Sequence, residues 1–237
     1  MILSYVLPAF KALSVAGVIV GFLVTAPLRE GLMTLQGLGA GEKQRRRARR
    51  CSAYARVLLG AMGIRAGVKG REHLRAMESR RGGYLIVSNH MAFWDMILLA
   101  SETSAVYITS VEIRETPILG WIAVASGCVF TERRDRTRTH EGVTEVARQL
   151  SAGVPVVLYA EGTSSDGSGV LPFKKSFFRS ALEASVPVLP MCLNYREIDG
   201  EPLSPANRDR VFYYGDQTFL SQLRQIFTTR EIIAELT

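Results

Sequence analysis

One stretch of the chain decides its fold and carries its most informative side chains: YLIVSNHMAFWD, residues 84–95. It opens with a short apolar run that includes β-branched residues, which predicts a buried strand. An apolar helix is expected to follow from Met96 to Ala100. His90 and Asp95 therefore lie in the turn from a core strand into a helix, where α/β proteins place reactive groups.

The spacing of His90 and Asp95 restricts how they can meet. Residues five apart on a continuous helix are rotated by roughly 140° from each other, so there they could not share a proton. They can meet only if His90 lies in the loop and Asp95 begins the helix, where the helix dipole also favours a carboxylate. The spacing alone is equally compatible with a structural histidine beside an N-capping aspartate.

Composition limits the class of protein. The chain has 237 residues, enough for one α/β domain and a smaller appendage, and 47% of them are hydrophobic. A net charge of +7 predicts an acidic partner, which could be a membrane surface, a phosphorylated metabolite or a nucleic acid. The three cysteines are far apart and the histidines number only three, which argues against a disulfide framework and a zinc site. No metal site is expected.

The amino-terminal segment predicts a membrane anchor. Residues 1–28 are almost entirely apolar apart from Lys11, and the 17 residues from Ala12 to Leu28 carry no charge. This length is at the short edge for a spanning helix. A signal peptide is the rival interpretation, but the segment has no cationic start and no convincing small-residue cleavage site. We expect a retained anchor that spans the bilayer or inserts partly.

A basic segment and a second helix follow. The helix is expected over residues 45–62 and should pack on the first. Cations beside an apolar helix indicate the cytoplasmic side and contact with anionic lipid, although a solvated linker would look similar. Binding to nucleic acid is disfavoured because no aromatic residues alternate with the cations. The cations are Lys43, Arg45, Arg46, Arg47, Arg49 and Arg50.

From residue 64 the composition is that of an ordinary α/β domain, so we divide the chain into a 1–63 anchoring helix pair and a 64–237 domain. The expected fold is α/β, with a central, mostly parallel sheet flanked by helices. Prolines at 187 and 190 suit an edge strand. Besides 84–88, strands are expected at 64–68, 105–109, 127–130, 154–160, 186–193, 210–214 and 232–236. Helices are expected at 71–78, 117–125 with Trp121 inward, 138–150 with His140 exposed, 173–183 and 218–227.

Polar residues also follow two other expected strands. Glu132 and Arg133 follow one, and the loop EGTSSDG, residues 161–167, follows the other. The glycines of that loop allow close backbone approach, and its amides could hold an anion. A P-loop is excluded because Ser168-Gly169 stands where Lys-Ser/Thr is required, and no GxSxG marks a serine hydrolase.

Together these motifs resemble the four sequence blocks of the glycerolipid acyltransferase family, of the lysophosphatidic acid acyltransferase (1-acylglycerol-3-phosphate O-acyltransferase) type. The resemblance covers about residues 65–215, and the amino-terminal helix pair also fits. The matching blocks are NHMAFWD (89–95) to NHxxxxD, VFTER (129–133) to a block that usually ends in Asp-Arg, EGTSS (161–165) to EGTRS, and VPVLP (186–190) to VPVxP.

Two departures from the family pattern concern the acceptor. Glu132 replaces the usual aspartate and keeps its charge, whereas Ser164 replaces an arginine that the family associates with the phosphate of the acceptor. Arg133 is retained, and Lys174 could supply the missing cation. Acceptors other than a lysophosphatidate, such as lyso-ornithine lipid, therefore stay open.

The resemblance implies acyl transfer from an acyl-CoA or acyl carrier protein thioester to a lysolipid hydroxyl, first of all 1-acylglycerol-3-phosphate to give phosphatidic acid. His90 would be the general base and Asp95 would orient it. No further cofactor is implied. The residues expected to bind substrate are Arg133, Glu161, Gly162, Thr163 and Lys174.

The expected location is the inner membrane, with the active site on the cytoplasmic face. A non-catalytic protein that binds anionic membranes is the alternative of another class, but intact His90, Asp95 and Glu161 argue against it. A third possibility, a nucleic-acid-binding protein, rests on net charge alone. The chain ends just after an expected strand, so a carboxy-terminal tail could be missing.

Overall fold

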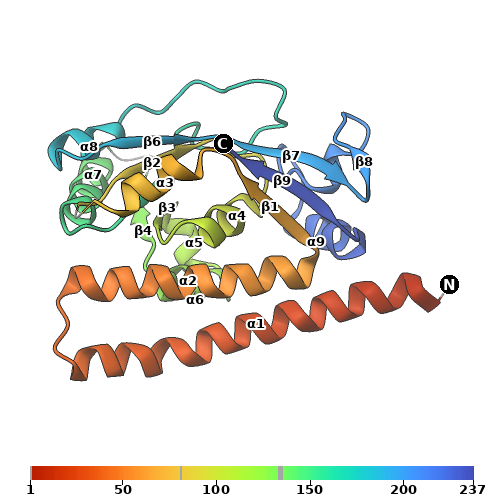
Figure 1. Ribbon diagram of the computed structural model, residues 1–237, viewed down its shortest axis with the longest axis horizontal. Helices are drawn as coiled ribbons and strands as arrows, with labels where there is room; N and C mark the ends of the chain where they lie inside the picture. Colours follow the sequence, from red (N-terminus) through yellow and green to blue (C-terminus); the bar gives the residue numbers. More distant parts are fainter. Residues whose placement is uncertain (1, 81, 133–135) are drawn as a thin grey trace.

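The computed structural model describes residues 2–80, 82–132 and 136–237. Its larger sheet has five parallel strands in the order β4-β3-β5-β2-β6, which confirms the predicted parallel sheet. Figure 1 labels β2, β3, β4 and β6 of this sheet. These strands are β2 (Leu85–Ser88), β3 (Val106–Ser110), β4 (Val129–Thr131), β5 (Val156–Tyr159) and β6 (Val188–Met191). Because the strands are parallel, their carboxyl ends share one edge, and the loops after β2, β4 and β5 gather there.

A second sheet adjoins the first, in the order β1-β9-β7-β8. Its strands are β1 (Ile64–Val68), β7 (Leu193–Ile198), β8 (Glu201–Pro202) and β9 (Ile232–Leu236). The single strand expected at 186–193 is therefore wrong. The chain leaves the first sheet after β6, and Cys192 exchanges two backbone hydrogen bonds with Thr237 as it enters the second. Strand β6 does lie at an edge, as its prolines predict.

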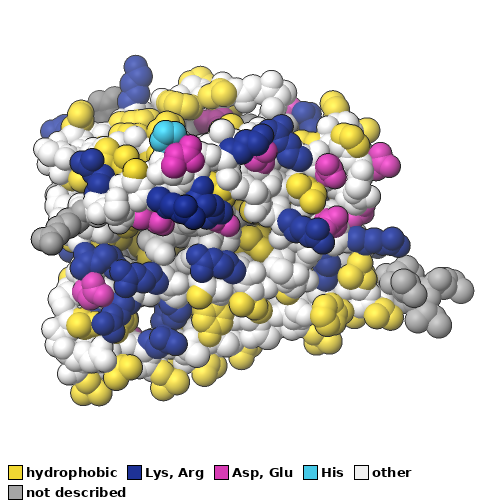
Figure 2. All heavy atoms as spheres, viewed as in Figure 1, with side chains coloured by type: hydrophobic (Ala, Val, Ile, Leu, Met, Phe, Trp, Pro, Cys, Tyr) yellow, Lys and Arg dark blue, Asp and Glu magenta, His cyan; other side chains and the backbone are white. Residues whose placement is uncertain are grey.

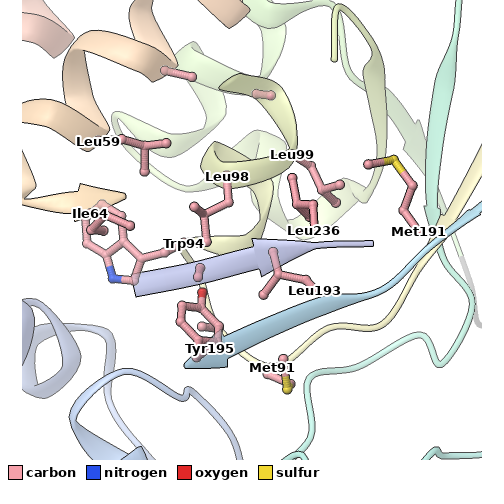
Figure 3. Close-up of a cluster of buried hydrophobic side chains, with 14 of the residues drawn as sticks. Leu59, Ile64, Met91, Trp94, Leu98, Leu99, Met191, Leu193, Tyr195 and Leu236 are labelled. Carbon is pink, nitrogen blue, oxygen red and sulfur yellow. The ribbon is translucent and has the colours of Figure 1, made fainter. Parts of the chain in front are cut away.

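Helices cover both faces of the larger sheet. On one face, Leu85 and Val156 pack with residues of α7 and α8. On the other, Ile86 and Val157 pack with residues of α4 and of the second sheet, in the cluster that Figure 3 shows. Adjacent residues point to opposite faces because the side-chain period of a strand is two, and both faces are buried as is usual for a parallel sheet. The helices of this part are α3 (Arg71–Glu78), α4 (Asp95–Glu102), α5 (Val111–Glu115), α6 (Leu119–Ser126), α7 (Arg136–Ser151), α8 (Phe178–Glu183) and α9 (Phe219–Thr228).

The amino-terminal part is an antiparallel pair of long helices, α1 (Ile2–Leu35) and α2 (Ala40–Met62), and α2 packs on both α1 and α4. Among the described residues, α1 is the one helix long and apolar enough to cross a membrane. Its outward side chains are apolar and exposed, and Figure 2 shows them along the edge of the molecule where α1 lies. They include Val6, Phe10, Leu13, Val20, Val24, Leu28, Leu32 and Leu35.

The cations of the basic segment are mostly engaged within the protein. Arg45 and Arg46 both pair with Glu42, and Arg47 pairs with Glu30 of α1. The Arg50 side chain is buried and donates to backbone carbonyl groups. Of the cations that predict lipid contact, Arg47 and Arg50 therefore join α2 to its neighbours, whereas the ion pairs of Arg45 and Arg46 lie within α2.

Gly63 separates α2 from β1, at the boundary proposed between the two parts of the chain. Its φ is +69°, and an added Cβ would lie against the carbonyl oxygen of Arg230. Both the positive φ and the close carbonyl oxygen therefore require glycine in this turn. The division into two domains stays a prediction.

Three local expectations are wrong. Trp121 is exposed, because it lies on the outer face of the short helix α6. Residues 210–214 form no strand. A 3₁₀ turn, η1 (Arg208–Arg210), ends at the first of them, and buried Val211 and Phe212 pack as a loop. The helix expected from residue 173 begins only at Phe178, because the amide of Lys174 donates to Ala160 and keeps the chain extended.

Lys11 fixes α1 to the rest of the molecule. This side chain interrupts the apolar run, yet it is buried. Its Nζ donates to the carbonyl oxygens of Met62, Thr229 and Arg230, the last two at 2.6 and 3.3 Å. An ammonium has three donors, and here all three find acceptors in two other segments of the chain.

We predict that Lys11→Met lowers the free energy of unfolding by about 1–3 kcal/mol, because it leaves buried carbonyl groups without a donor. Chemical denaturation in detergent measures this loss, and hydrogen exchange at residues 229–232 should increase. Lys69→Met is the matched control, because Lys69 is exposed and pairs only at the surface with Glu235. Equal stability of the two variants would contradict the role of Lys11.

Candidate active site

The loop after β2 is held in place by Asn89. The side-chain amide of Asn89 donates to the carbonyl oxygen of Leu193 at 2.9 Å, and its oxygen accepts from the Leu193 amide at 2.8 Å. Both backbone groups of one residue at the start of β7 are thus satisfied by one side chain. This pair of bonds fixes the direction in which the chain leaves the sheet towards His90.

His90 lies in that loop and Asp95 is the first residue of α4, as their spacing requires for contact. Asp95 is fully buried. Its Oδ2 lies 2.9 Å from His90 Nδ1 and accepts from the amides of Met91 and Ala92, at 2.6 and 2.8 Å. The turn therefore binds a carboxylate with its own backbone, and that carboxylate in turn orients the imidazole.

The other oxygen of Asp95 has a partner from the second sheet. The Tyr195 hydroxyl, on β7, donates to Oδ1 at 2.7 Å. Burial raises the pKa of Tyr195 well above its usual value, and the nearby Asp95 charge raises it further, so the hydroxyl stays protonated as a donor. Sequence reasoning missed this residue, because no motif marks it. The one available signal was the tyrosine itself, because a buried tyrosine hydroxyl needs a hydrogen-bond partner.

Tyr159, the last residue of β5, covers one face of the histidine. The rings of His90 and Tyr159 stack with centroids 4.1 Å apart and planes 16° from parallel. The His90 side chain keeps 21% of its surface exposed, so a substrate can reach it. Because Nδ1 faces Asp95, Nε2 is the ring nitrogen left to exchange a proton with another molecule.

The loop after β5 packs against the histidine loop. The Ser165 amide donates to the carbonyl oxygen of His90 at 2.9 Å. Buried Glu161 accepts from the Leu171 amide at 2.9 Å, so its carboxylate organises the loop. Gly162 has a φ of +75°, which allows the chain to turn there. The structure thus places Glu161 and Gly162 beside the site.

The remaining residues predicted to bind substrate lie at the surface or outside the described residues. Thr163 and Lys174 are exposed. Arg133 lies outside the described residues. Its neighbour Glu132 follows β4, on the same sheet edge as His90 but on the far side of β3 and β5.

Two cavities adjoin this edge. One, of about 210 Å³, lies beside Met91 and Tyr195. The other, of about 570 Å³, is lined by one residue of β4, by the residues that follow β3 and β4 and by residues of α7: Phe130, Val111, Glu132, Arg138, Glu141, Gly142 and Glu145. In the part of the chain that the structure describes, no group of three histidines, cysteines or carboxylates is placed to hold a metal ion.

Comparison with known proteins identifies the family of this chain. The family model described as Acyltransferase matches residues 65–194. The chain is 35% identical over 159 residues to the lyso-ornithine lipid O-acyltransferase of Brucella abortus, covering 64% of this chain and 60% of the relative. It is 32% identical over 170 residues to the protein of that name from Rhizobium meliloti, covering 69% and 56%.

A further relative has a different name. The chain is 30% identical over 168 residues to the 1-acyl-sn-glycerol-3-phosphate acyltransferase of Neisseria gonorrhoeae, covering 70% of this chain and 63% of the relative. In each case the chain spans less than two thirds of the length of the curated relative.

A solved structure shares the fold. The crystal structure of the 1-acyl-sn-glycerophosphate (LPA) acyltransferase PlsC from Thermotoga maritima matches with a TM-score of 0.66 at 19% identity, covering all of this chain and 84% of that one. Since the family model matches more than half of the chain, the protein belongs to the acyltransferase family.

Proposed function

We propose that the protein is a membrane-bound O-acyltransferase that moves a fatty acyl group from a thioester to the free hydroxyl of a lysolipid. The observation that carries this proposal is the contact of His90 with buried Asp95, which leaves Nε2 of an accessible imidazole for the acceptor hydroxyl. The donor is acyl-CoA or an acyl carrier protein thioester, and no other cofactor is required.

In the proposed reaction, His90 Nε2 takes the proton of the acceptor hydroxyl as its oxygen attacks the thioester carbon. The tetrahedral intermediate then expels the thiolate, and His90 returns the proton to sulfur. The products are an ester and a free thiol. The substrate supplies the nucleophile, so no acyl-enzyme is formed.

Asp95 stabilises the imidazolium that forms during the transfer. The two backbone amides and the Tyr195 hydroxyl donate three hydrogen bonds to this buried carboxylate. The same three bonds hold the carboxylate still, so the imidazole needs no reorientation when it becomes charged.

The acceptor that we propose first is lyso-ornithine lipid, with 1-acylglycerol-3-phosphate second. Ser164 stands where the resembling block carries an arginine, so residues 161–167 carry no cation for a phosphate, and the nearest cations along the chain are Lys174 and Lys175.

Three glutamates, Glu132, Glu141 and Glu145, line the larger cavity with one cation, Arg138. Glu145 also pairs with Arg148, but the excess of carboxylates over cations in the lining suits an amine better than a phosphate. The relatives from Brucella abortus and Rhizobium meliloti, both named for lyso-ornithine lipid, share more identity with the chain than the Neisseria gonorrhoeae relative does, although a relative of the same name from Rhodobacter capsulatus shares only 28%.

The other binding roles follow from position. We propose that Glu161, Gly162 and Thr163 shape the acceptor pocket, and that Arg133 and Lys174 bind the anionic group of the acceptor. The outward face of α1 would lie in the inner membrane, with anionic lipid near the exposed cations and the active site on the cytoplasmic face.

We predict that His90→Ala lowers kcat/KM for acyl transfer by about 10²–10⁴-fold, because the general base is lost. The assay uses purified protein in detergent with acyl-CoA or acyl carrier protein as donor and a panel of lysolipids as acceptors. His140→Ala is the control, since His140 is exposed on α7. Activity of His90→Ala near that of wild type would remove His90 from this role, and no transfer by the wild type to any acceptor would refute the enzyme proposal.

In the same panel, the wild type should prefer lyso-ornithine lipid to 1-acylglycerol-3-phosphate. Ser164→Arg should move that preference towards the phosphate acceptor, because it adds a cation to the loop after β5. Ser79→Arg adds the same charge at an exposed position after α3 and should leave the preference unchanged. A wild type that favours the phosphate acceptor would reverse the proposed order.

Tyr195→Phe should lower kcat about tenfold with little change in KM, because hydrogen bonds to charged groups contribute about 1.5–3 kcal/mol and this one positions Asp95 without contacting substrate. Tyr84→Phe is the matched control, since the Tyr84 hydroxyl is buried without a hydrogen-bond partner among the described residues. If both variants keep wild-type kcat, the Tyr195 hydroxyl has no part in the reaction.

A further inference from the structure

Helix α6 presents an apolar face to the outside. Its eight residues, LGWIAVAS, carry no charge. Ile118, Trp121 and Val124 keep 49%, 63% and 52% of their surfaces exposed. Residues three apart lie on one side of a helix, so these three form a continuous surface, the α6 patch. Most of the exposed apolar residues of a soluble protein are scattered singly, whereas these are grouped.

The backbone holds the first residue of the α6 patch outward. Ile118 has φ +67° and ψ −56°, and the Leu119 amide donates to the carbonyl oxygen of Pro117 at 2.7 Å. This is a three-residue γ-turn with a β-branched residue at positive φ, a strained arrangement. Such strain persists only where the surroundings impose it, and it is concentrated at functional sites.

The α6 patch adjoins the outward face of α1. The guanidinium of Arg50 donates to the carbonyl oxygen of Ala26 in α1 and to that of Ala125 in α6. One buried side chain thus joins the two helices. Val24 and Leu28, two residues either side of Ala26, are exposed on α1. Figure 1 shows α6 in the layer of α1 and α2, on the side away from the strand β6.

We propose that the α6 patch is a second lipid contact, with Trp121 at the boundary between the headgroups and acyl chains of the bilayer that α1 enters. This inference rests on the proposed membrane location of α1. A bilayer fits because the patch lacks charge, continues an apolar helix face and carries a tryptophan, the residue that membrane interfaces favour.

A second contact has a mechanical consequence. A single helix in the membrane leaves the attached domain free to rotate about the helix axis. Contact at α1 and at α6 together removes that rotation, so the sheet edge that carries His90 keeps one orientation to the bilayer. The lipid acceptor and the acyl chains reside in the bilayer, so a fixed orientation would keep His90 facing its substrates.

The chain provides its own reporter, because it has only two tryptophans. Trp94 is 2% exposed in the core, and Trp121 is 63% exposed. The full chain is bound to vesicles of phosphatidylcholine and phosphatidylglycerol, with and without bromine on the acyl chains. Bromine on the acyl chains should quench much of the Trp121 fluorescence. Iodide in the aqueous phase should quench little of it. Trp121→Phe should remove the component that bromine quenches.

Flotation of the vesicles gives a second readout. Trp121→Ser should lower the partition coefficient roughly tenfold, whereas Leu182→Ser, which removes an exposed apolar residue from α8, should not. The proposal is overturned if the protein floats with vesicles while Trp121 remains open to iodide, or if a second copy covers the patch in sedimentation analysis.

The two proposals fail differently. Bromine quenching of Trp121 in a protein that transfers no acyl group supports the α6 contact and refutes the enzyme proposal. Acyl transfer by a protein whose Trp121 stays in water supports the enzyme proposal and refutes the α6 contact. A protein that binds no vesicles at all refutes the α6 contact together with the membrane location.

Discussion

The buried carboxylate of Asp95 is the point on which the site and much of the fold depend. Its oxygens face His90 Nδ1, two amides of the β2–α4 turn and the hydroxyl of Tyr195. A buried charge is costly unless donors surround it, so the turn, the helix start and β7 must all be in place together. Asn89 makes a second link between the same loop and β7. The geometry of the candidate site and the joining of the two sheets are therefore one arrangement.

The sequence predicts the first half of this arrangement. The apolar run from residue 84, its polar end and the five-residue spacing require His90 in the loop and Asp95 at the helix start, and both lie there. The second half has no local signal. Tyr195 is 100 positions from Asp95, and only the path of the chain from β6 into the second sheet brings it there. Periodicity reports burial along one element, but it cannot report which distant element completes a site.

The errors in the fold have the same origin. Trp121 was expected inward because tryptophan is apolar, but the helix that carries it lies at the surface beside α1. Lys11 looked like an interruption of an anchor, yet it binds carbonyl groups from two distant segments. In both cases the neighbours of the residue, and not its own type, determine its role. Elements whose burial follows their own pattern, such as α7 and β9, lie close to where the sequence predicts them.

In the proposed reaction one nitrogen exchanges the proton, Nε2 of a neutral His90 whose Nδ1 carries the hydrogen facing Asp95. The most direct test is the nitrogen NMR spectrum of the full chain labelled only at histidine, with His90 assigned by its loss in His90→Ala and with exposed His73 and His140 as references. The account predicts that neutral His90 has its proton on Nδ1 and an unprotonated Nε2. A neutral His90 with its proton on Nε2 would contradict it.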